Sequence, residues 1–249
     1  MEELKGRSAL VVGASSGIGR ATLVALAANG MRVLGVARSA DRLERIAREA
    51  PGEARAMAAD ATRADTIADA MERADPDLVV ITLGARPRMA SLDEQTWESF
   101  SEVWNSDVHA TFHVCQAALR RPLRAGSTVV IVSSGAAIGG SPLSGGYAGA
   151  KRMQWLLAGY AQGISDRRRL GVRFVALLPK QLIVGTTTGE AAAAAYAAQA
   201  GITEAAFMER FGTPLAPEGV ADAIIRIARG QAGRDATALA VTGSGIEAL

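Results

Sequence analysis

Tyr147 and Lys151 form the pair of residues whose spacing most strongly predicts chemistry, within the stretch Y-A-G-A-K. A separation of four residues places both side chains on one face of a helix. A free phenol, with a pKa of ~10, is a poor acid or base at neutral pH, but a nearby ammonium group favours the phenolate and lowers that pKa. The pair is therefore suited to exchanging a proton with an alcohol or a carbonyl oxygen. The plainer alternative is a surface pair on a helix.

Ser134 stands at the end of the apolar run 127–134, shortly before Tyr147. In open α/β sheets a ligand binds at the carboxyl ends of the strands, where such a serine would lie. We expect its hydroxyl to hold the reacting oxygen beside the tyrosine. A serine in a Ser/Gly loop is by itself more often structural, and the order of strand, loop and helix is what favours the chemical interpretation.

A glycine-rich turn, V-V-G-A-S-S-G-I-G, lies between the first apolar run and the first helical stretch. Gly13 permits a tight turn, while Gly17 and Gly19 let the backbone approach a diphosphate closely. The N–H groups at the start of the helix would then bind the anion. A glycine pattern alone more often marks a plain turn, but its position between a strand and a helix favours a dinucleotide site. The residues expected to bind the dinucleotide here are Gly13, Ser15, Ser16, Gly17, Ile18 and Gly19.

Arg38 follows the next apolar run and bears on the kind of dinucleotide. An acidic residue at this point would bind the ribose 2′-hydroxyl of NAD(H), and neither residue 37 nor residue 38 is acidic. The planar guanidinium of Arg38 instead suits a 2′-phosphate. The sequence therefore predicts NADP(H) over NAD(H), against the alternative of an exposed loop arginine.

The elements that must position these residues are apolar runs that alternate with helical stretches. Continuously apolar strands separated by helices indicate a parallel sheet covered on both faces, and right-handed crossovers make it doubly wound. We expect one Rossmann-like α/β domain over residues 1–249, with about seven strands. The expected strands are 8–12, 31–37, 53–59, 77–82, 127–134, 172–178 and 239–242, and the expected helices are 17–29, 41–50, 62–74, 94–121 and 148–166.

Composition excludes several other classes of protein. Lys+Arg 27 against Asp+Glu 25 gives a net charge of +2, which is too balanced to indicate a nucleic-acid-binding protein. The single cysteine, Cys115, excludes an internal disulfide framework. No apolar run approaches the ~20 residues that span a bilayer, and the charged N-terminus is unlike a signal peptide. We expect a soluble cytoplasmic protein without a nucleic-acid or membrane partner.

The G-A-S-S-G-I-G turn, the spacing of Ser134, Tyr147 and Lys151, and the chain length together resemble the short-chain dehydrogenase/reductase family over nearly the whole chain. The resemblance implies reversible hydride transfer between a nicotinamide and a carbonyl or secondary alcohol carbon. It implies that Tyr147 is the acid/base, that Lys151 holds the nicotinamide ribose and favours the phenolate, and that Ser134 polarises the carbonyl. It also implies a homotetramer or a homodimer.

The same resemblance implies further cofactor contacts. Asp60 matches the family's adenine contact, with Ala61 beside it, although Asp60 could also cap the expected helix 62–74. Where the family has N-N-A-G after the fourth strand, this chain has T-L-G-A, and Pro179 is followed by Lys180 instead of glycine. We expect that lysine to put a cation near the diphosphate or the nicotinamide. The remaining expected cofactor contacts are Gly84, Ala85, Pro179 and Leu182.

Asp107 is the most consequential departure, because the resemblance aligns it with the family's catalytic asparagine. That asparagine is thought to hold a water that links the lysine to solvent. A carboxylate would stabilise Lys151 as a cation while repelling a neighbouring phenolate. We expect an active enzyme with an altered pH profile. The alternatives are a cofactor-binding homologue with weak or lost turnover and a regulatory or structural role, or a member with lyase, dehalogenase-like or epimerase chemistry.

Other polar and aromatic pairs are weaker signals. His109 and His113 have a spacing that zinc sites use, but no third ligand accompanies them, and we expect packing or an interface and no metal. Trp97 and Trp104 are expected to be core or interface anchors. The loop arginines 86 and 88, on either side of a proline, are expected to be solvated, with attraction of an anionic substrate as the alternative.

The segment from about 183 to 212 is expected to contact the substrate. Its alanine-rich stretch 189–201 predicts a helix, and its position between two loop-like stretches also fits a mobile lid. Its apolar content suggests a pocket for a small, mainly apolar molecule. The residues concerned are Ile183, Val184, Tyr196, Phe207, Met208 and Phe211, with threonines 186–188 at the entrance.

Overall fold

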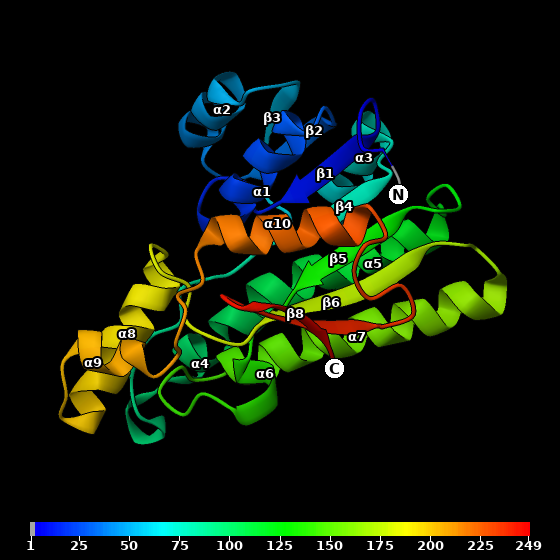
Figure 1. Cartoon of the computed structure of the whole chain (residues 1–249). Coiled ribbons are helices and arrows are strands. Elements are labelled where there is room, and N and C mark those ends of the chain that lie inside the picture. Colours follow the sequence, from blue (N-terminus) through cyan, green and yellow to red (C-terminus); the bar gives the residue numbers. More distant parts are fainter. Residues whose placement is uncertain (1–2) are drawn as a thin grey trace.

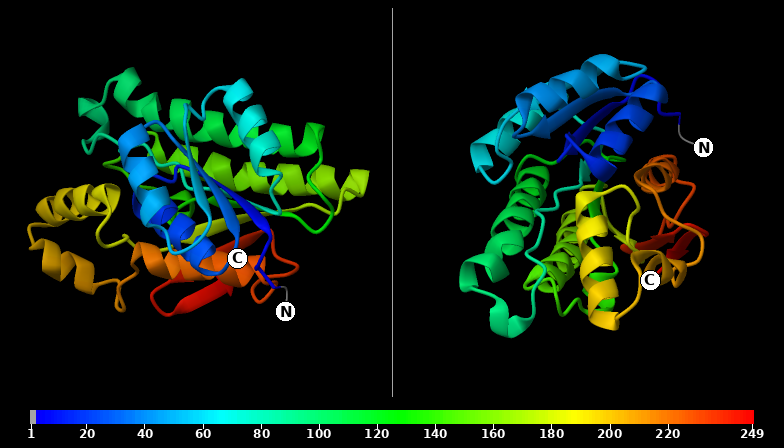
Figure 2. Two further views of the ribbon diagram at one scale, coloured as in Figure 1. Left: turned by 90° about the horizontal axis from the view of Figure 1, so that it is seen from above. Right: turned by 90° about the vertical axis from the view of Figure 1, so that its left-hand side faces the viewer.

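The computed structural model describes residues 3–249, which form one eight-stranded sheet with helices on both faces (Figure 1, Figure 2). The strand order is β3-β2-β1-β4-β5-β6-β7-β8, and every pair is parallel except β7–β8. The expected doubly wound parallel sheet is confirmed. The strands are β1 (Ser8–Val12), β2 (Arg32–Ala37), β3 (Ala54–Ala58), β4 (Leu78–Ile81), β5 (Thr128–Val132), β6 (Arg173–Pro179), β7 (Ala238–Thr242) and β8 (Gly245–Ala248).

The helices connect successive strands and continue past β6 into a pair at one end of the sheet, α8 and α9 (Figure 1). They are α1 (Gly17–Ala28), α2 (Ala40–Glu49), α3 (Ala64–Ala74), α4 (Trp97–Val103), α5 (His109–Arg120), α6 (Ala136–Gly139), α7 (Tyr147–Arg168), α8 (Thr187–Ala200), α9 (Glu204–Glu209) and α10 (Pro217–Ala228), with a 3₁₀ turn at Leu92–Glu94 and a π-helical turn at Trp104–Val108.

Alternation along the strands divides the core into two layers. In β1, Ala9 and Val11 pack with α1, α2 and α10 on one face, whereas Leu10 and Val12 pack with α3, α5 and α7 on the other. All five residues of β1 are buried. Strands covered on both faces read as continuous apolar runs, which is why these strands were recognisable in the sequence.

Four elements fall outside the expected set: the short helices α6 and α9, the strand β8 and the helix α10. Strand β8 is a short antiparallel edge strand whose residues are mostly exposed, so it has no apolar run to reveal it. Helix α10 packs beside α1 and begins with Pro217 in its first turn, a residue that favours this position. Its buried Val220, Ile224 and Ile227 repeat at helical spacing and would have been a usable signal.

The expected continuous helix 94–121 is instead interrupted. Helices α4 and α5 are joined by the π-helical turn, which contains Asp107. Such turns occur mostly as single interruptions of α-helices and frequently at functional sites. Trp97 and Trp104 are 74% and 44% exposed, so neither is a core residue. Over residues 3–249, none of the helices combines the length and the apolar character that crossing a bilayer requires.

Candidate active site

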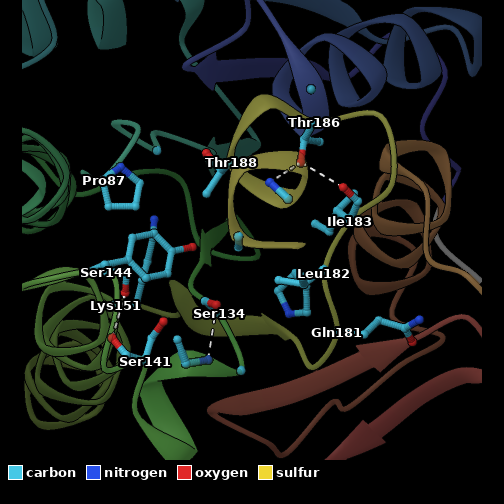
Figure 3. Close-up of a pocket in the computed structure, with 18 of the residues that line it drawn as sticks. Pro87, Ser134, Ser141, Ser144, Lys151, Gln181, Leu182, Ile183, Thr186 and Thr188 are labelled. Carbon is cyan, nitrogen blue, oxygen red and sulfur yellow. Dashed lines mark hydrogen bonds between the residues drawn. The ribbon is translucent and has the colours of Figure 1, made fainter. Parts of the chain in front are cut away.

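A cavity of about 480 Å³ lies at the carboxyl ends of the central strands, where the chain order reverses between β1 and β4. This is the place where doubly wound sheets bind ligands. Ser134, Tyr147 and Lys151 line it, and so do Ser16, Gly17 and Ile18 of the glycine turn, whereas Gly13, Ser15 and Gly19 do not. Figure 3 shows Ser134 and Lys151 beside this space, together with Leu182, Ile183 and Thr186 from the segment before α8.

The glycine turn is built for close approach. Gly13 and Gly17 have φ values of +94° and +48°, which favour glycine. A Cβ on Gly19 would collide with the carbonyl oxygen of Gly13, so that glycine is needed for α1 to pack against the strand end. Helix α1 begins at Gly17 without a side-chain cap and without an acidic residue in its first turn. Its first N–H groups therefore suit the diphosphate of a dinucleotide.

Arg38 and Asp60 lie beyond the ends of β2 and β3, and both are exposed. The Asp60 carboxylate accepts hydrogen bonds from the backbone N–H and the hydroxyl of Thr62, both at 2.9 Å. These bonds hold the pKa of Asp60 below its ordinary value, and the positive charge of Arg38 acts in the same direction. The alternative that Asp60 caps α3 is wrong, because the N-cap is Arg63. Ala61 is buried beside it.

Tyr147 and Lys151 share one face of α7, as their spacing predicts. Tyr147 is the first residue of the helix and is half-buried, and the Lys151 ammonium lies 5.5 Å from the centre of its ring. Ser134 follows β5 and lines the same cavity. Its Oγ accepts a hydrogen bond from the Ala136 N–H at 3.2 Å, which leaves its own proton free to donate. The structure therefore brings the three residues together.

Asp107 and Lys151 form a buried ion pair. Asp107 is fully buried and Lys151 is 3% exposed, and Nζ lies 2.9 Å from Oδ2. The other carboxylate oxygen, Oδ1, accepts hydrogen bonds from the Ala85 N–H at 3.0 Å and the Ser106 hydroxyl at 2.7 Å. Burial lowers the pKa of Lys151, but the charges of Asp107 and Tyr147 outweigh it, so the pKa of the ammonium is raised. Lys151 is held as a cation.

Gln154 completes this network and was not anticipated. The Lys151 ammonium also donates to the Leu83 carbonyl and to Gln154 Oε1, each at 2.9 Å. Gln154 is fully buried and donates from Nε2 to Thr111 Oγ1 at 2.7 Å, and Thr111 donates to the Asp107 carbonyl at 2.7 Å. A polar residue on the lysine's face of α7, three positions further along, was the available sequence signal.

The turn after β4 belongs to the same network. The Leu83 carbonyl and the Ala85 N–H bind Lys151 and Asp107, respectively, while Gly84 lines the cavity. The expected contacts Pro179 and Leu182 also line it.

Three further charges border the cavity or its entrance loop. Lys180 lines the cavity, as expected of a cation near the diphosphate or the nicotinamide, but its ammonium forms an ion pair with Glu247 of β8 at 2.8 Å, which balances its charge. Arg86 and Arg88 are exposed on either side of the buried Pro87, which does line the cavity.

The two histidines of α5 contact each other through their rings. The centroids of His109 and His113 are 4.7 Å apart. Desolvation and the charge of His109 lower the pKa of His113. Among residues 3–249, no cluster of three or more His, Cys, Asp or Glu side chains is placed to hold a metal ion.

With this geometry established, comparison with known proteins defines the class. The sequence model of the family described as short chain dehydrogenase matches residues 7–196. The chain therefore belongs to the short-chain dehydrogenase family. A solved structure named as a short chain dehydrogenase/reductase family protein is 26% identical, with a TM-score of 0.76, and the match covers 97% of this chain and 98% of that one.

Individual curated relatives match over shorter stretches of the chain. The chain is 33% identical over 129 residues to D-erythrulose reductase of Gallus gallus, a match that covers 52% of each protein. It is 32% identical over 136 residues to D-threitol dehydrogenase of Mycolicibacterium smegmatis, with 51% of this chain and 52% of that protein covered. The chain thus spans about half the length of these curated relatives. The crystal structure of a short chain dehydrogenase from Mycobacterium avium, at 23% identity and a TM-score of 0.76, shares the fold.

Proposed function

We propose that this protein is an NADP(H)-dependent oxidoreductase that interconverts a carbonyl and a secondary alcohol in a small, mainly apolar molecule. The observation that carries the proposal is the juxtaposition of Tyr147, Lys151 and Ser134 in the cavity that the glycine turn also lines. Family membership and relatives named as reductases and dehydrogenases support it.

The residues present fit a dinucleotide. The uncapped start of α1 and the glycine turn would hold the diphosphate, Asp60 and Ala61 the adenine, and Arg38 a 2′-phosphate. When bound, the nicotinamide supplies or accepts the hydride. Positioning and electrostatics are the protein's contribution to this chemistry.

Side chains of the protein carry out the proton transfer. In the reducing direction, Ser134 donates a hydrogen bond to the substrate carbonyl and Tyr147 gives its phenolic proton to the nascent alkoxide. The buried Lys151 cation stabilises the resulting phenolate. The Asp107 carboxylate, which is paired with Lys151, opposes that negative charge, and we expect it to alter the pH profile of turnover.

We propose that α8 and α9 form a lid over the substrate side of the cavity. The two ends of this segment meet at a parallel bridge between Ile183 and Leu215, where the Val184 N–H donates to the Leu215 carbonyl at 3.0 Å. A segment held together at its base is suited to move as a unit over a site.

The test is consumption of NADPH or NADH, followed by absorbance, across a panel of ketones and alcohols. Tyr147→Phe should lose at least about a hundred-fold in turnover. The exposed Tyr160, which lies further along α7, provides the matched control Tyr160→Phe, and this variant should keep full activity. Unchanged turnover in Tyr147→Phe would show that the proton-transfer assignment is wrong.

Cofactor preference has a separate test. Arg38→Asp should lower the preference for NADPH over NADH by about ten- to a hundred-fold, because a charge-assisted contact to the phosphate is lost. The exposed Arg226 on α10 allows the same change of charge away from the cavity, so Arg226→Asp should leave the preference intact. Equal preferences in both variants would rule out the phosphate contact.

One observation favours the second candidate, a cofactor-binding homologue with weak or lost turnover. The Asp107 carboxylate lies 2.9 Å from Lys151 Nζ, in the place that the resemblance gives to an asparagine. This candidate predicts that the protein binds NADPH, as measured by fluorescence titration, and that Asp107→Asn gains many-fold in turnover.

We further propose a homodimer or homotetramer. Trp104 and Phe112 are 44% and 45% exposed and line a hollow of about 300 Å³ together with Met153 and Leu157 of α7. Exposed apolar patches of this kind mark interaction surfaces. Light scattering tests the assembly. The cytoplasmic location stays a prediction.

A further inference from the structure

The substrate side of the cavity carries a group of three aromatic rings. Tyr196 of α8 stacks on Phe207 of α9, with centroids 6.1 Å apart and planes 11° from parallel. Phe211, just after α9, meets Phe207 edge to face at 5.8 Å. All three are half-buried and line the cavity. They give it an extended aromatic wall that a flat apolar group can cover.

Other walls of the cavity carry apolar side chains too. Pro87 and Met89 come from the loop after β4, and Pro142 comes from the loop between α6 and α7. Figure 3 shows Pro87 on the same side of the cavity as Ser144 and across from Ile183. Pro87, Met89 and Pro142 offer no strong hydrogen-bond donor or acceptor.

Many hydroxyl groups that line the cavity are already bonded to the protein. The Tyr196 hydroxyl lies 2.7 Å from Ser141 Oγ and also accepts from the Leu143 N–H at 3.2 Å. A polyol that entered this space would lose hydration at several hydroxyls without finding matching partners, which disfavours its binding. The other bonded hydroxyls are Thr82 to the Val12 carbonyl, Ser133 to the Lys151 carbonyl, Ser144 to the Ser141 carbonyl and Thr186 to the Ile183 carbonyl.

The hydroxyls that remain belong to the dinucleotide turn (Ser16), to the expected catalytic residues and to the start of α8. Ser134 and Tyr147 serve the carbonyl. Thr187 and Thr188 open α8, next to Thr186, whose methyl group would meet a Cβ on Gly17 of the dinucleotide turn. The aromatic part of the cavity is therefore the part with the fewest free polar groups.

The charges in the cavity are likewise matched. Among the described residues that line it, the charged side chains are Lys151 and Lys180, and each has a carboxylate partner at 2.9 Å and 2.8 Å. A charged substrate would find no unpaired counter-charge among them, and burying an unpaired charge is strongly unfavourable.

We propose that the substrate is a neutral ketone, or the matching secondary alcohol, with an aromatic ring next to the reacting carbon. The ring packs on Tyr196, Phe207 and Phe211 while the carbonyl oxygen meets Ser134 and Tyr147. This proposal rests on the proposed oxidoreductase function. It separates this chain from its relatives named as D-erythrulose reductase and D-threitol dehydrogenase, whose named compounds are small polyhydroxy molecules.

The test compares three carbonyl compounds with NADPH. These are diacetyl, acetylbenzoyl (in which a phenyl group replaces one methyl group of diacetyl) and D-erythrulose. The value of kcat/KM should be at least about tenfold higher for acetylbenzoyl than for diacetyl, and lowest for D-erythrulose. Higher values for D-erythrulose or diacetyl would overturn the aromatic substrate class while leaving the oxidoreductase function in place.

A substitution at the aromatic wall localises the effect. Phe207→Leu keeps an apolar side chain but removes the ring, so KM for acetylbenzoyl should rise several-fold, and by more than the KM for diacetyl. The exposed Tyr160 on α7 provides the control, and Tyr160→Leu should change none of these values. An unchanged KM for acetylbenzoyl in Phe207→Leu would refute the aromatic contact.

Binding separates this proposal from the proposed function. Calorimetric titration of acetylbenzoyl into the protein saturated with NADP⁺ reports on the ring site without turnover. Binding that weakens in Phe207→Leu supports the aromatic site even when none of the three compounds is reduced, a result that would refute the oxidoreductase function alone. Absence of binding under the same conditions refutes the aromatic site.

Discussion

The base of the cavity and its α8–α9 side are stabilised by different kinds of interaction. At the base, Lys151, Asp107, Gln154 and Thr111 are buried and connected to one another by an ion pair and hydrogen bonds. On the α8–α9 side, the packing is mainly between half-buried aromatic rings, and one tyrosine hydroxyl anchors them to the neighbouring loop.

Buried polar networks and apolar packing respond differently to the substitution of a side chain. A buried polar group that loses its partner keeps the full penalty of desolvation, so each member of the base depends on the others. Apolar packing responds to volume and adapts to similar side chains. The base is therefore suited to fix the chemistry, and the α8–α9 side is suited to change substrate preference without loss of the fold.

Removing the charge of Lys151 should produce the largest effect. Lys151→Met leaves the fully buried Asp107 carboxylate unpaired, so the free energy of unfolding should fall by about 3–5 kcal/mol, and turnover should be lost as well. Denaturant unfolding measures this. The matched control is Lys180→Met, which breaks a pair with partly exposed partners and should cost less than about 1 kcal/mol. An equal decrease in the free energy of unfolding in Lys151→Met and Lys180→Met would contradict the special dependence of the base on its buried ion pair.

The sign of the pH dependence follows from the raised pKa of Lys151. Because the folded-state pKa lies above the unfolded value, the contribution to stability is fully present below the ordinary lysine pKa. It is lost as the pH rises through the folded-state value. The wild-type protein should therefore lose stability at alkaline pH more steeply than the double variant Lys151→Met with Asp107→Asn.

Asp107→Asn should have the next largest effect, on activity. The amide keeps the shape but removes a negative charge next to Lys151, so the phenolate form becomes easier to reach. The acidic limb of the pH profile for alcohol oxidation should therefore move to lower pH. The ammonium, in turn, loses the charge that raises its pKa. An unchanged profile would show that Asp107 has no electrostatic influence on the proton transfer.

Local patterns in the sequence account for the elements and for part of the site. The glycine turn, the Tyr147–Lys151 spacing and the apolar strands are short-range signals. The structure places part of the glycine turn in one cavity with Tyr147 and Lys151. Partners that are distant along the chain left no such signal. Gln154 and Thr111 are 43 residues apart, and Lys180 and Glu247 are 67 apart, so folding alone brings each pair together.

Gln154→Met tests the residue that sequence patterns missed. Methionine approximates the volume of glutamine but offers neither a strong acceptor for Lys151 nor a donor for Thr111. The free energy of unfolding should fall by about 1–3 kcal/mol. The exposed Gln199 of α8 gives the control Gln199→Met, which should be close to neutral. A neutral Gln154→Met would mean that the network does not depend on this side chain.

Tyr196→Phe should give the smallest effect, because it keeps the aromatic ring and removes only the hydroxyl that bonds Ser141 and the Leu143 N–H. The free energy of unfolding should fall by about 1 kcal/mol, while KM for the ketone rises a few-fold and kcat is unchanged. Ser141→Ala should have a smaller effect, and the double variant should add little to Tyr196→Phe, because that change already removes the bond between the two hydroxyls. Fully additive losses would show that this hydrogen bond does not anchor α8, and that apolar packing alone holds the α8–α9 side in place.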